Sequence, residues 1–428
     1  MSLSWRPGQR ECCDAGLAIL TRYNLLYMAC QVRTGKSLMS MTIAKERGWK
    51  RVCFITSKKA MSSVKLDYTT KFDHKFEKFT LINYESAHTL YDEYDGYILD
   101  EATKLAAFPK QTKINITISK LTLPRRRPVI LMSGTPTPES PSQIFHQLSV
   151  SYYSPFSVYK NFYAWSKDFV KHYEFRDGNG ALKKRVKQKW IHGTSMNDYS
   201  EGLEDKIKET TKHYTVSLSQ QDVGFKEFVQ EEIMWIDINP QIYQLLKVLK
   251  KDKIYRMKAT GDCIVGDNPG KLQSLFHQLC SGTVIADNGT HIIDRSKVDF
   301  IKTKFRGQKI AIFYHFIAEG QILREAFPNN TDNPELFNSE DNLVFICQMV
   351  SGRFGVNLST ADWVVMYNIG FSATTYFQIR ARMQDQARTK ECKLAWLFSR
   401  EGIEKKIYRV ITVKKAPYTL RYFTRDFL

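Results

Sequence analysis

Short apolar runs alternate with longer amphipathic stretches along the first part of this chain. An apolar run at residues 25–29 is followed by a polar loop and then by a helical pattern that begins at residue 38. Further runs with the length of a buried strand lie at residues 52–55, 79–82, 97–99 and 128–132. Strands that alternate with helices are typical of parallel sheets with helices on both faces. The first 150 residues therefore predict a doubly wound α/β domain.

Apolar runs of the same kind return in the last third of the chain, at residues 309–314, 343–347 and 363–367. They predict a second parallel sheet. The region between the two sets is rich in aromatic residues, and it contains a glycine turn that leads into a basic run. We therefore predict an α/β protein of three parts, which are a first lobe at 1–150, a helical and basic-hairpin insertion at 151–235 and a second lobe at 236–428.

Composition narrows the class of protein. The chain has 428 residues, of which 43% are hydrophobic, and this is enough for two or three domains with real cores. Its net charge of +19 favours a polyanionic partner, nucleic acid first, although solubility alone is an alternative. Eight scattered cysteines without a C-x-x-C pair argue against a zinc ribbon and fit a reducing compartment.

No stretch of the sequence is apolar for the length of a membrane span, and the N-terminal residues lack the apolar core of a secretory signal. We therefore expect a cytoplasmic protein with no membrane partner, monomeric in solution. For a phage-encoded protein this would be the host cytoplasm.

The polar loop from Cys30 to Ser37 lies between a predicted strand and a predicted helix, and it ends in Gly-Lys-Ser. This is the context of a phosphate-binding loop, in which backbone amides and the helix N-terminus surround phosphate groups. We expect Lys36 to reach the outer phosphates of ATP and Ser37 to hold Mg²⁺. The usual pattern has glycine where this chain has Cys30, so the loop alone is a weak signal.

Two carboxylates follow the apolar run at 97–99, as they do when a central strand ends at a nucleotide. Asp100 is expected to bind Mg²⁺ through water, and Glu101 to polarise the attacking water. A solvated acidic turn is the alternative. The phosphate loop and the carboxylates, in this order, predict a nucleotide hydrolase. Upstream, the amide of Gln9 is placed to read the edge of adenine.

The order and spacing of five segments resemble the first-lobe motifs of superfamily-two helicases, and the Swi/Snf branch most. These segments are Trp-Arg-Pro-x-Gln at 5–9, Thr-Gly-Lys-Ser at 34–37, Ile-Asn-Tyr-Glu at 82–85, Asp-Glu-Ala-Thr at 100–103 and Ser-Gly-Thr-Pro at 133–136. The resemblance implies two RecA-like lobes with ATP between them and DNA across both. It adds Thr34 and Gly35 to the ATP site. The nucleic-acid contacts that it implies in this lobe are Ser57, Lys58, Asn83, Tyr84, Ser133, Gly134 and Thr135.

The later parts of the chain carry the resemblance further. Residues 190–203 are similar to the insertion of fork-remodelling, strand-annealing members, and 236–295 to the helical entry of the second lobe. Residues 351–358 resemble helicase motif five, and 378–382 resemble motif six. The implied roles are ATP contact for Gly355 and Asn357, nucleic-acid contact for Phe316, Ser351 and Arg353, and a catalytic arginine at Arg382.

Two features leave alternatives open. The basic run, with Lys183, Lys184, Arg185 and Lys187, could grip phosphates or wedge a strand junction, or it could be a solvated charged surface. Asp385 stands where motif six usually has its second arginine, and a carboxylate aimed at a triphosphate would repel it. Either Arg388 or Arg380 substitutes through a local shift, or hydrolysis is weak, or this position has been altered.

The sequence thus predicts an ATP- and Mg²⁺-dependent DNA translocase or helicase that acts on duplex or branched DNA. We expect a role in replication, recombination or repair. Because the short chain leaves no room for modules that read chromatin, we expect phage or bacterial origin. The alternatives are an RNA helicase and a non-hydrolysing, ATP-responsive DNA-binding or loading protein.

Overall fold

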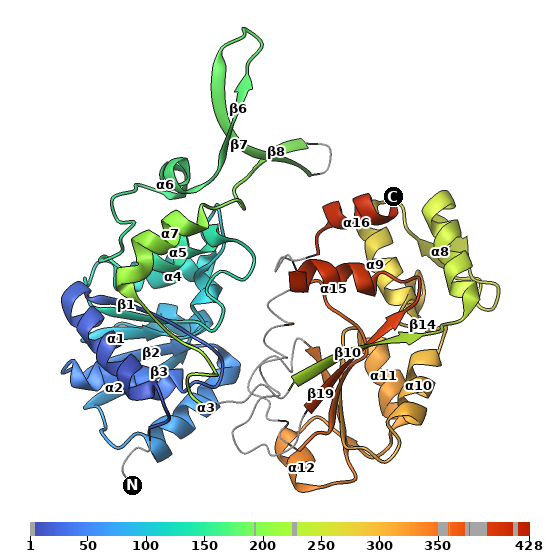
Figure 1. Ribbon diagram of the computed structural model, residues 1–428, viewed down its shortest axis with the longest axis horizontal. Coiled ribbons are helices and arrows are strands. Elements are labelled where there is room, and N and C mark those ends of the chain that lie inside the picture. Colours follow the sequence, from blue (N-terminus) through green and yellow to red (C-terminus); the bar gives the residue numbers. More distant parts are fainter. Residues whose placement is uncertain are drawn as a thin grey trace. The chain divides into compact units, whose positions relative to one another are not determined.

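The computed structural model describes residues 5–191, 194–224, 229–349, 358, 360–372, 376, 392–413 and 418–428. The chain folds as two compact units, Met1–Phe225 and Lys226–Leu428. Figure 1 shows the first unit in blue and green and the second in yellow to red. None of the helices in the described part of the chain is both long and apolar enough to cross a membrane.

The first unit is built on a six-stranded parallel sheet. In spatial order its strands are β3 (Lys78–Asn83), β2 (Arg51–Thr56), β4 (Gly96–Leu99), β5 (Val129–Met132), β1 (Leu25–Cys30) and β9 (Thr215–Leu218). The helices of this unit are α1 (Gln9–Tyr23), α2 (Lys36–Glu46), α3 (Met61–Leu66), α4 (Lys113–Thr122), α5 (Ile144–Leu148), α6 (Phe162–Phe169) and α7 (Glu204–Thr211). Short helical turns are η1 (Lys58–Ala60), η2 (Asp67–Lys71), η3 (Tyr84–Thr89), η4 (Ala102–Leu105), η5 (Pro141–Gln143) and η6 (Lys212–Tyr214).

Both faces of this sheet are buried, because successive side chains of a strand point to opposite faces. In β1, Leu25 and Tyr27 join one hydrophobic core, whereas Leu26 and Met28 join another. The central strands are apolar throughout for this reason, which is why their positions could be predicted as uninterrupted apolar runs.

A three-stranded antiparallel sheet interrupts the first unit between α6 and α7. Its strands are β6 (His172–Arg176), β7 (Leu182–Ile191) and β8 (Thr194–Asp198). The β6–β7 hairpin, drawn in green, projects from the rest of the unit in Figure 1. The predicted hairpin is confirmed, and its turn lies at the glycine-containing residues 176–180, as predicted.

The second unit repeats the architecture with another six-stranded parallel sheet. In spatial order the strands are β10 (Val229–Ile236), β19 (Cys392–Ser399), β18 (Trp363–Met366), β15 (Ile310–Tyr314), β17 (Val344–Gln348) and β16 (Asn330–Thr331). Its helices are α8 (Pro240–Asp252), α9 (Pro269–Leu279), α10 (Ser296–Lys304), α11 (Ile317–Ala326), α12 (Pro334–Ser339), α15 (Glu404–Val413) and α16 (Leu420–Phe427). Two small antiparallel ribbons are β11 (Ile254–Arg256) with β12 (Cys263–Val265) and β13 (Thr283–Ala286) with β14 (Gly289–Ile292).

The predicted α/β fold, with two RecA-like parallel-sheet lobes and a hairpin-bearing insertion, is confirmed. The three-part division of the chain stays a prediction. Within the range assigned to the insertion, β9 extends the sheet of the first unit, and nearly all of β10 belongs to the sheet of the second.

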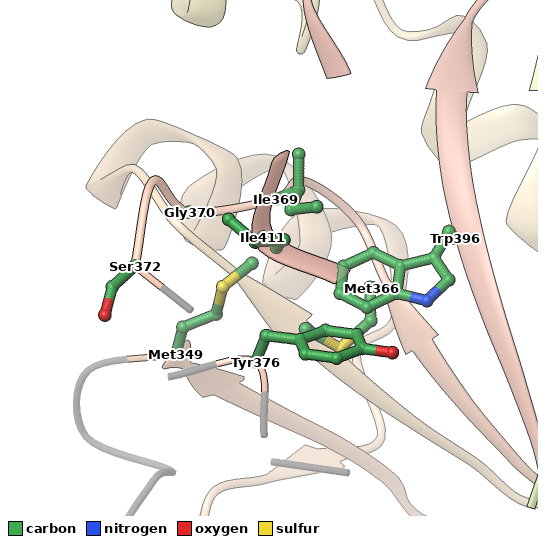
Figure 2. Close-up of a pocket in the computed structure, with 8 residues that line it drawn as sticks. All are labelled: Met349, Met366, Ile369, Gly370, Ser372, Tyr376, Trp396 and Ile411. Atoms are coloured by element: carbon green, nitrogen blue, oxygen red, sulfur yellow. The ribbon is translucent and has the colours of Figure 1, made fainter. Parts of the chain in front are cut away.

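A small apolar pocket in the second unit, shown in Figure 2, is lined by Met349, Met366, Ile369, Gly370, Ser372, Tyr376, Trp396 and Ile411.

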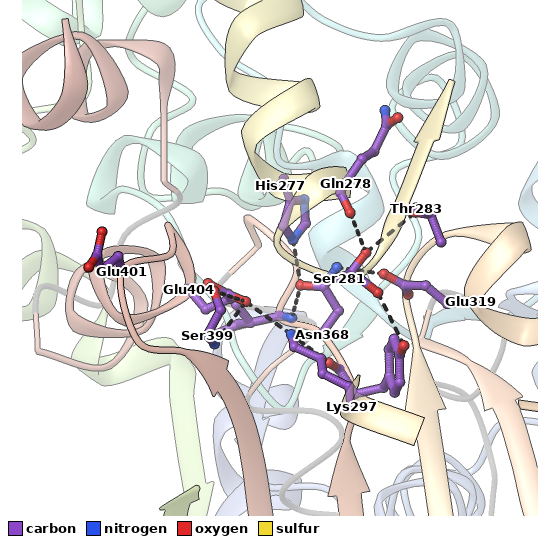
Figure 3. A network of polar contacts seen from close by, with 12 residues as sticks. His277, Gln278, Ser281, Thr283, Lys297, Glu319, Asn368, Ser399, Glu401 and Glu404 are labelled. Carbon is purple, nitrogen blue, oxygen red and sulfur yellow. Dashed lines mark hydrogen bonds and ion pairs between the residues drawn. The ribbon is translucent and has the colours of Figure 1, made fainter. Parts of the chain in front are cut away.

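A buried polar network ties helices of the second unit to its sheet (Figure 3). Lys297 on α10 donates from Nζ to Glu404 Oε1 at 3.0 Å and to the Tyr367 carbonyl at 3.2 Å. Ser399 Oγ donates to Glu404 Oε2 at 2.9 Å. Lys297 is 1% exposed and Glu404 is fully buried, so each charge depends on these partners instead of on water.

A second branch of the network centres on His277 of α9. His277 Nε2 lies 2.8 Å from Asn368 Oδ1, and Asn368 Nδ2 donates to Glu319 Oε1 at 2.7 Å. Burial lowers the pKa of His277 well below its ordinary value of 6.5 and also lowers the pKa of His315. Burial raises the pKa of Glu319. The imidazoles are therefore neutral in the folded state at neutral pH.

We expect the second unit to lose stability as the pH falls below about 6.5, where histidine in the unfolded chain takes up a proton that the buried rings refuse. Each histidine should contribute about 1.4 kcal/mol per pH unit until its own depressed folded-state pKa is reached. Glu319 acts in the opposite sense, because its raised pKa favours the folded state at low pH. Urea unfolding of the parent and of His277→Gln between pH 7.5 and 5.5 measures the difference. An identical pH slope in both proteins would contradict the assignment to His277.

Candidate nucleotide-binding site

The loop between β1 and α2 has the geometry of a phosphate-binding turn. β1 ends at Cys30, and α2 begins at Lys36 after Gly35, which has a φ of 86°. Arg33 is also left-handed, with a φ of 66°. The amides of the first turn of α2 have no partner within the helix, and they present its positive end at this point. An anion at the start of α2 would be bound by both effects.

Hydrogen bonds within the loop fix its curvature. Thr34, which is fully buried, donates from Oγ1 to the Gln31 carbonyl at 2.8 Å. Lys36 Nζ reaches back across the loop to the same carbonyl at 3.0 Å. The ammonium group of Lys36 therefore lies over the loop, where it would meet the outer phosphates of a bound nucleotide.

Gln9 of α1 supports the loop from outside. Its Nε2 donates to the Thr34 carbonyl at 2.8 Å, and its Oε1 accepts from the Arg6 amide at 2.8 Å. Arg6 in turn donates from its guanidinium to the Arg33 carbonyl at 3.0 Å. Gln9 thus bonds the loop directly and also through Arg6, and its predicted contact with adenine stays a prediction.

Gly35 is required both for its backbone conformation and for its lack of a side chain. A Cβ at this position would lie 2.4 Å from Gln9 Nε2. We expect Gly35→Ala to lose ATP binding, because the side chain displaces Gln9 and distorts the loop. Gly48→Ala is the matched control, since Gly48 has a φ of 88° but nothing within 4 Å of an added Cβ.

The free energy of unfolding of the control should fall by only about 1–2 kcal/mol, which is the cost of an alanine in the left-handed conformation. Its nucleotide affinity should be unchanged. Titration with a fluorescent ATP analogue and urea unfolding of both variants separate the two effects. Equal losses of ATP affinity would contradict the role given to Gln9.

The two predicted carboxylates lie at the end of β4. Asp100 is 8% exposed, and its Oδ2 accepts from Thr56 Oγ1 at 2.8 Å. Glu101 follows with a φ of 52°, in the left-handed region that non-glycine residues avoid. Strain of this kind is concentrated at functional sites, where it directs a side chain. Here it turns the chain sharply after the strand and keeps Glu101 half-exposed beside the buried Asp100.

Tyr84 is placed beneath these carboxylates. The ring is 1% exposed, and its hydroxyl donates to the Asp100 carbonyl at 2.7 Å. Burial, and after it the charges of Asp100 and Glu101, raise the pKa of Tyr84. The residue therefore stabilises the carboxylate turn, and its predicted contact with nucleic acid stays a prediction.

The Ser-Gly-Thr-Pro loop after β5 packs against the phosphate loop. A Cβ on Gly134 would lie 3.4 Å from the Val32 amide nitrogen. Ser133 is fully buried, donates from its amide to the Met28 carbonyl at 3.1 Å, and accepts from the Thr135 amide at 3.1 Å. The structure thus brings this predicted segment next to the predicted ATP-binding residues.

Further predicted residues follow neighbouring strands at the same sheet edge, because the carboxyl ends of parallel strands share one edge. Ser57 and Lys58 follow β2, and Asn83 ends β3, where its Oδ1 accepts from the Ser86 amide at 2.9 Å. Lys58 is exposed, whereas Ser57 is 4% exposed and its hydroxyl has no hydrogen-bond partner among the described residues. This edge therefore collects most of the first-lobe residues that the sequence singled out.

Other predicted residues lie elsewhere. Phe316 follows β15 in the second unit, where its ring centroid is 5.0 Å from that of His277. The basic residues Lys183, Lys184, Arg185 and Lys187 lie on β7 of the hairpin. Ser351, Arg353, Gly355, Asn357, Arg382 and Asp385 lie outside the described residues.

Gln220 and Gln31 are site residues that sequence reasoning missed. Gln220 follows β9. Its backbone N–H donates to Gln31 Oε1 at 2.9 Å, and its side-chain Nε2 donates to the Val32 carbonyl at 3.0 Å. The phosphate loop is thus held by residues from both ends of the first unit. No local pattern marks a contact between residues 189 positions apart.

The residues present fit a magnesium ion bound together with a nucleotide. Ser37 and Asp100 offer the oxygen ligands that Mg²⁺ prefers, and the ion usually takes its other ligands from phosphate and water. In the part of the chain that the structure describes, no group of three or more His, Cys, Asp or Glu side chains could hold a metal ion alone.

The matches of this chain to known proteins come from solved structures. No protein-family model matches the chain, and no curated protein matches its sequence. Among solved structures, the Sulfolobus solfataricus SWI2/SNF2 ATPase core in complex with dsDNA is similar at 14% identity with a TM-score of 0.40, over 96% of this chain and 91% of that chain. The Sulfolobus solfataricus SWI2/SNF2 ATPase core domain is similar at 14% identity with a TM-score of 0.41, over 99% of this chain and 90% of that chain.

Proposed function

We propose that this protein is an ATP-dependent DNA translocase whose first unit binds and hydrolyses ATP. The observation that carries the proposal is the arrangement at one edge of the first sheet. The Gly35–Lys36–Ser37 turn follows β1, and the Asp100–Glu101 pair follows β4, with only β5 between the two strands. A phosphate cradle and a pair of carboxylates at this spacing are the parts that phosphoryl transfer to water requires.

Each residue has a stated role in this proposal. Lys36 and the amides at the start of α2 bind the phosphates, and Ser37 and Asp100 hold Mg²⁺, which neutralises charge on the phosphates when bound. Glu101 orients the attacking water and accepts its proton. Arg382, Gly355 and Asn357 of the second unit complete the ATP site in the proposal.

DNA is the proposed polymer. The net charge of +19 favours a polyanion, and the Asn-Tyr-Glu and Asp-Glu-Ala-Thr segments resemble the Swi/Snf branch more than RNA helicases. We further propose that the protein prefers forked or branched DNA and acts in replication, recombination or repair. We also propose that it is a monomeric cytoplasmic protein of phage or bacterial origin.

The test is ATP turnover in the presence of single-stranded, duplex, forked and four-way DNA and of RNA. We expect the branched DNAs to stimulate turnover most, with the Lys36→Ala variant as the control for contaminating activity. Turnover that no polymer stimulates would overturn the proposal. Stimulation by RNA alone would favour an RNA helicase instead.

A second candidate is an ATP-responsive DNA-loading protein that does not hydrolyse ATP. Asp385 favours it, because this carboxylate replaces an arginine that assists hydrolysis in the proteins that the chain resembles. If Lys36→Ala leaves DNA remodelling intact, this candidate replaces the first. Turnover that rises in Asp385→Arg would show that hydrolysis is the native activity and that this position limits it.

A further inference from the structure

We propose that one face of the β6–β7 hairpin is a stacking platform for the unpaired bases of single-stranded DNA. The residues of this face, which we term the aromatic–basic face, are Lys171, Tyr173, Phe175, Lys183, Arg185 and Lys187. The inference extends the proposed action on DNA by naming the form of DNA that the insertion takes. It does not depend on ATP hydrolysis.

Strand pairing places these side chains together. In the antiparallel register, Tyr173 lies opposite Arg185, and Phe175 lies opposite Lys183. Directly opposed residues share one face of a β-ribbon, and every second residue returns to it. The hairpin therefore carries two rings and four cations on the same side.

At the base of the hairpin, the opposite side packs inward. Val186 is 4% exposed and belongs to a hydrophobic core of the first unit, and His172 is its cross-strand partner. Because neighbouring side chains alternate between faces, Tyr173 and Arg185 point away from that core. Tyr173 is 39% exposed, and Phe175 is partly exposed.

Each ring is paired with a cation. The Arg185 guanidinium carbon lies 4.3 Å from the centroid of Phe175, and Lys171 Nζ lies 5.1 Å from the centroid of Tyr173. Acidic groups offset part of the charge: Lys183 pairs with Asp177 at 2.7 Å, and Lys187 pairs with Glu201, which also accepts from the Tyr173 hydroxyl. Residues 171–191 nevertheless contain seven Lys or Arg and two Asp or Glu, which leaves a net charge of +5.

This combination selects single strands over duplexes. Cations attract the phosphates of both forms, but only an unpaired strand exposes the faces of its bases to a ring. Exposed rings in a basic groove are the elements by which proteins bind single strands without sequence preference. Phosphate binding alone does not require aromatic rings, and Tyr173 and Phe175 belong to none of the hydrophobic cores of the described residues.

The test removes the rings and keeps the strand. In Tyr173→Val/Phe175→Val, β-branched residues preserve strand propensity. Affinity of the full chain for fluorescent oligo-dT and for a duplex of equal length is measured by anisotropy without ATP. We expect oligo-dT binding to weaken by about five- to a hundredfold per ring and duplex binding to stay unchanged.

Two further variants keep the result interpretable. Tyr91→Val removes a ring that is 86% exposed elsewhere on the first unit, and we expect no effect on either DNA. The exchange Tyr173→Phe/Phe175→Tyr retains both rings, and we expect it to bind oligo-dT like the parent, because stacking needs a ring at each position and not a particular one.

Two outcomes would overturn the proposal: unchanged oligo-dT binding in the double valine variant, or an equal loss for oligo-dT and duplex. Because these measurements need no ATP, a protein that fails to hydrolyse ATP can still pass them. Conversely, duplex-stimulated ATP turnover would survive the failure of the stacking platform. The two proposals therefore fail separately.

Discussion

Replacing Glu101 by Gln is expected to lower kcat for ATP hydrolysis by about 10²–10⁴-fold and to leave ATP binding nearly unchanged. The amide keeps the size of the carboxylate, but it cannot take the proton of the attacking water. Glu101 is half-exposed in a left-handed turn next to Asp100, so the substitution removes a base without disturbing a packed side chain. Single-turnover kinetics with excess enzyme measure the chemical step, and titration with an ATP analogue measures binding.

The exposed Glu93→Gln, on the surface before β4, is the matched control, and its kcat should equal that of the parent. A Glu101→Gln protein that hydrolyses ATP at the parental rate would show that another group activates water. A protein that loses ATP binding instead would place Glu101 in nucleotide contact. Either result would change the role that we assign to it.

Replacing Lys297 by Met is expected to cost about 3–5 kcal/mol of stability in the second unit, because it leaves the Glu404 carboxylate buried without its cation. Lys297 and Glu404 are 1% and 0% exposed, so water cannot take the place of the lost partner. Ser399 continues to donate to Glu404, but it carries no charge that would offset the carboxylate. Urea unfolding followed by amide exchange in β18 and β19 measures the loss.

The double variant Lys297→Met/Glu404→Leu should recover most of this stability, because apolar groups can replace a buried pair at little cost. Lys271→Met breaks an exposed pair with Asp267, whose side chains are 53% and 54% exposed, and it should leave the unfolding midpoint nearly unchanged. If Lys297→Met behaves like Lys271→Met, the buried pair is not a stabilising element, and the expectation is wrong.

The predicted strands correspond closely to those of the structure, for a physical reason. β1, β2, β4, β5 and β15 are buried on both faces, so each is a continuous apolar run that needs no partner to be recognised. β9 reads Thr-Val-Ser-Leu, with two of its four side chains buried, and at the edge of a sheet it leaves no such run. Sequence reasoning therefore missed it.

The candidate site was predictable where its residues are neighbours in the chain. The Gly35–Lys36–Ser37 turn and the Asp100–Glu101 pair follow strands that could be recognised, and parallel pairing then brings them to one edge. Contacts across the fold were not predictable. The bond from Gln9 to the Thr34 carbonyl depends on how α1 packs, and the bonds from Gln220 depend on a strand that the sequence did not reveal.

The route of the chain through β9 links the hairpin physically to the phosphate loop. After β5 the chain leaves the first sheet, builds the hairpin, and returns beside β1, where Gln220 bonds to Gln31 and Val32. A force exerted on the hairpin by a bound DNA strand would be transmitted through α7 and β9 to the phosphate loop. It also follows that a shortened protein without the hairpin must keep residues 215–220, since otherwise the cradle loses one of its two supports.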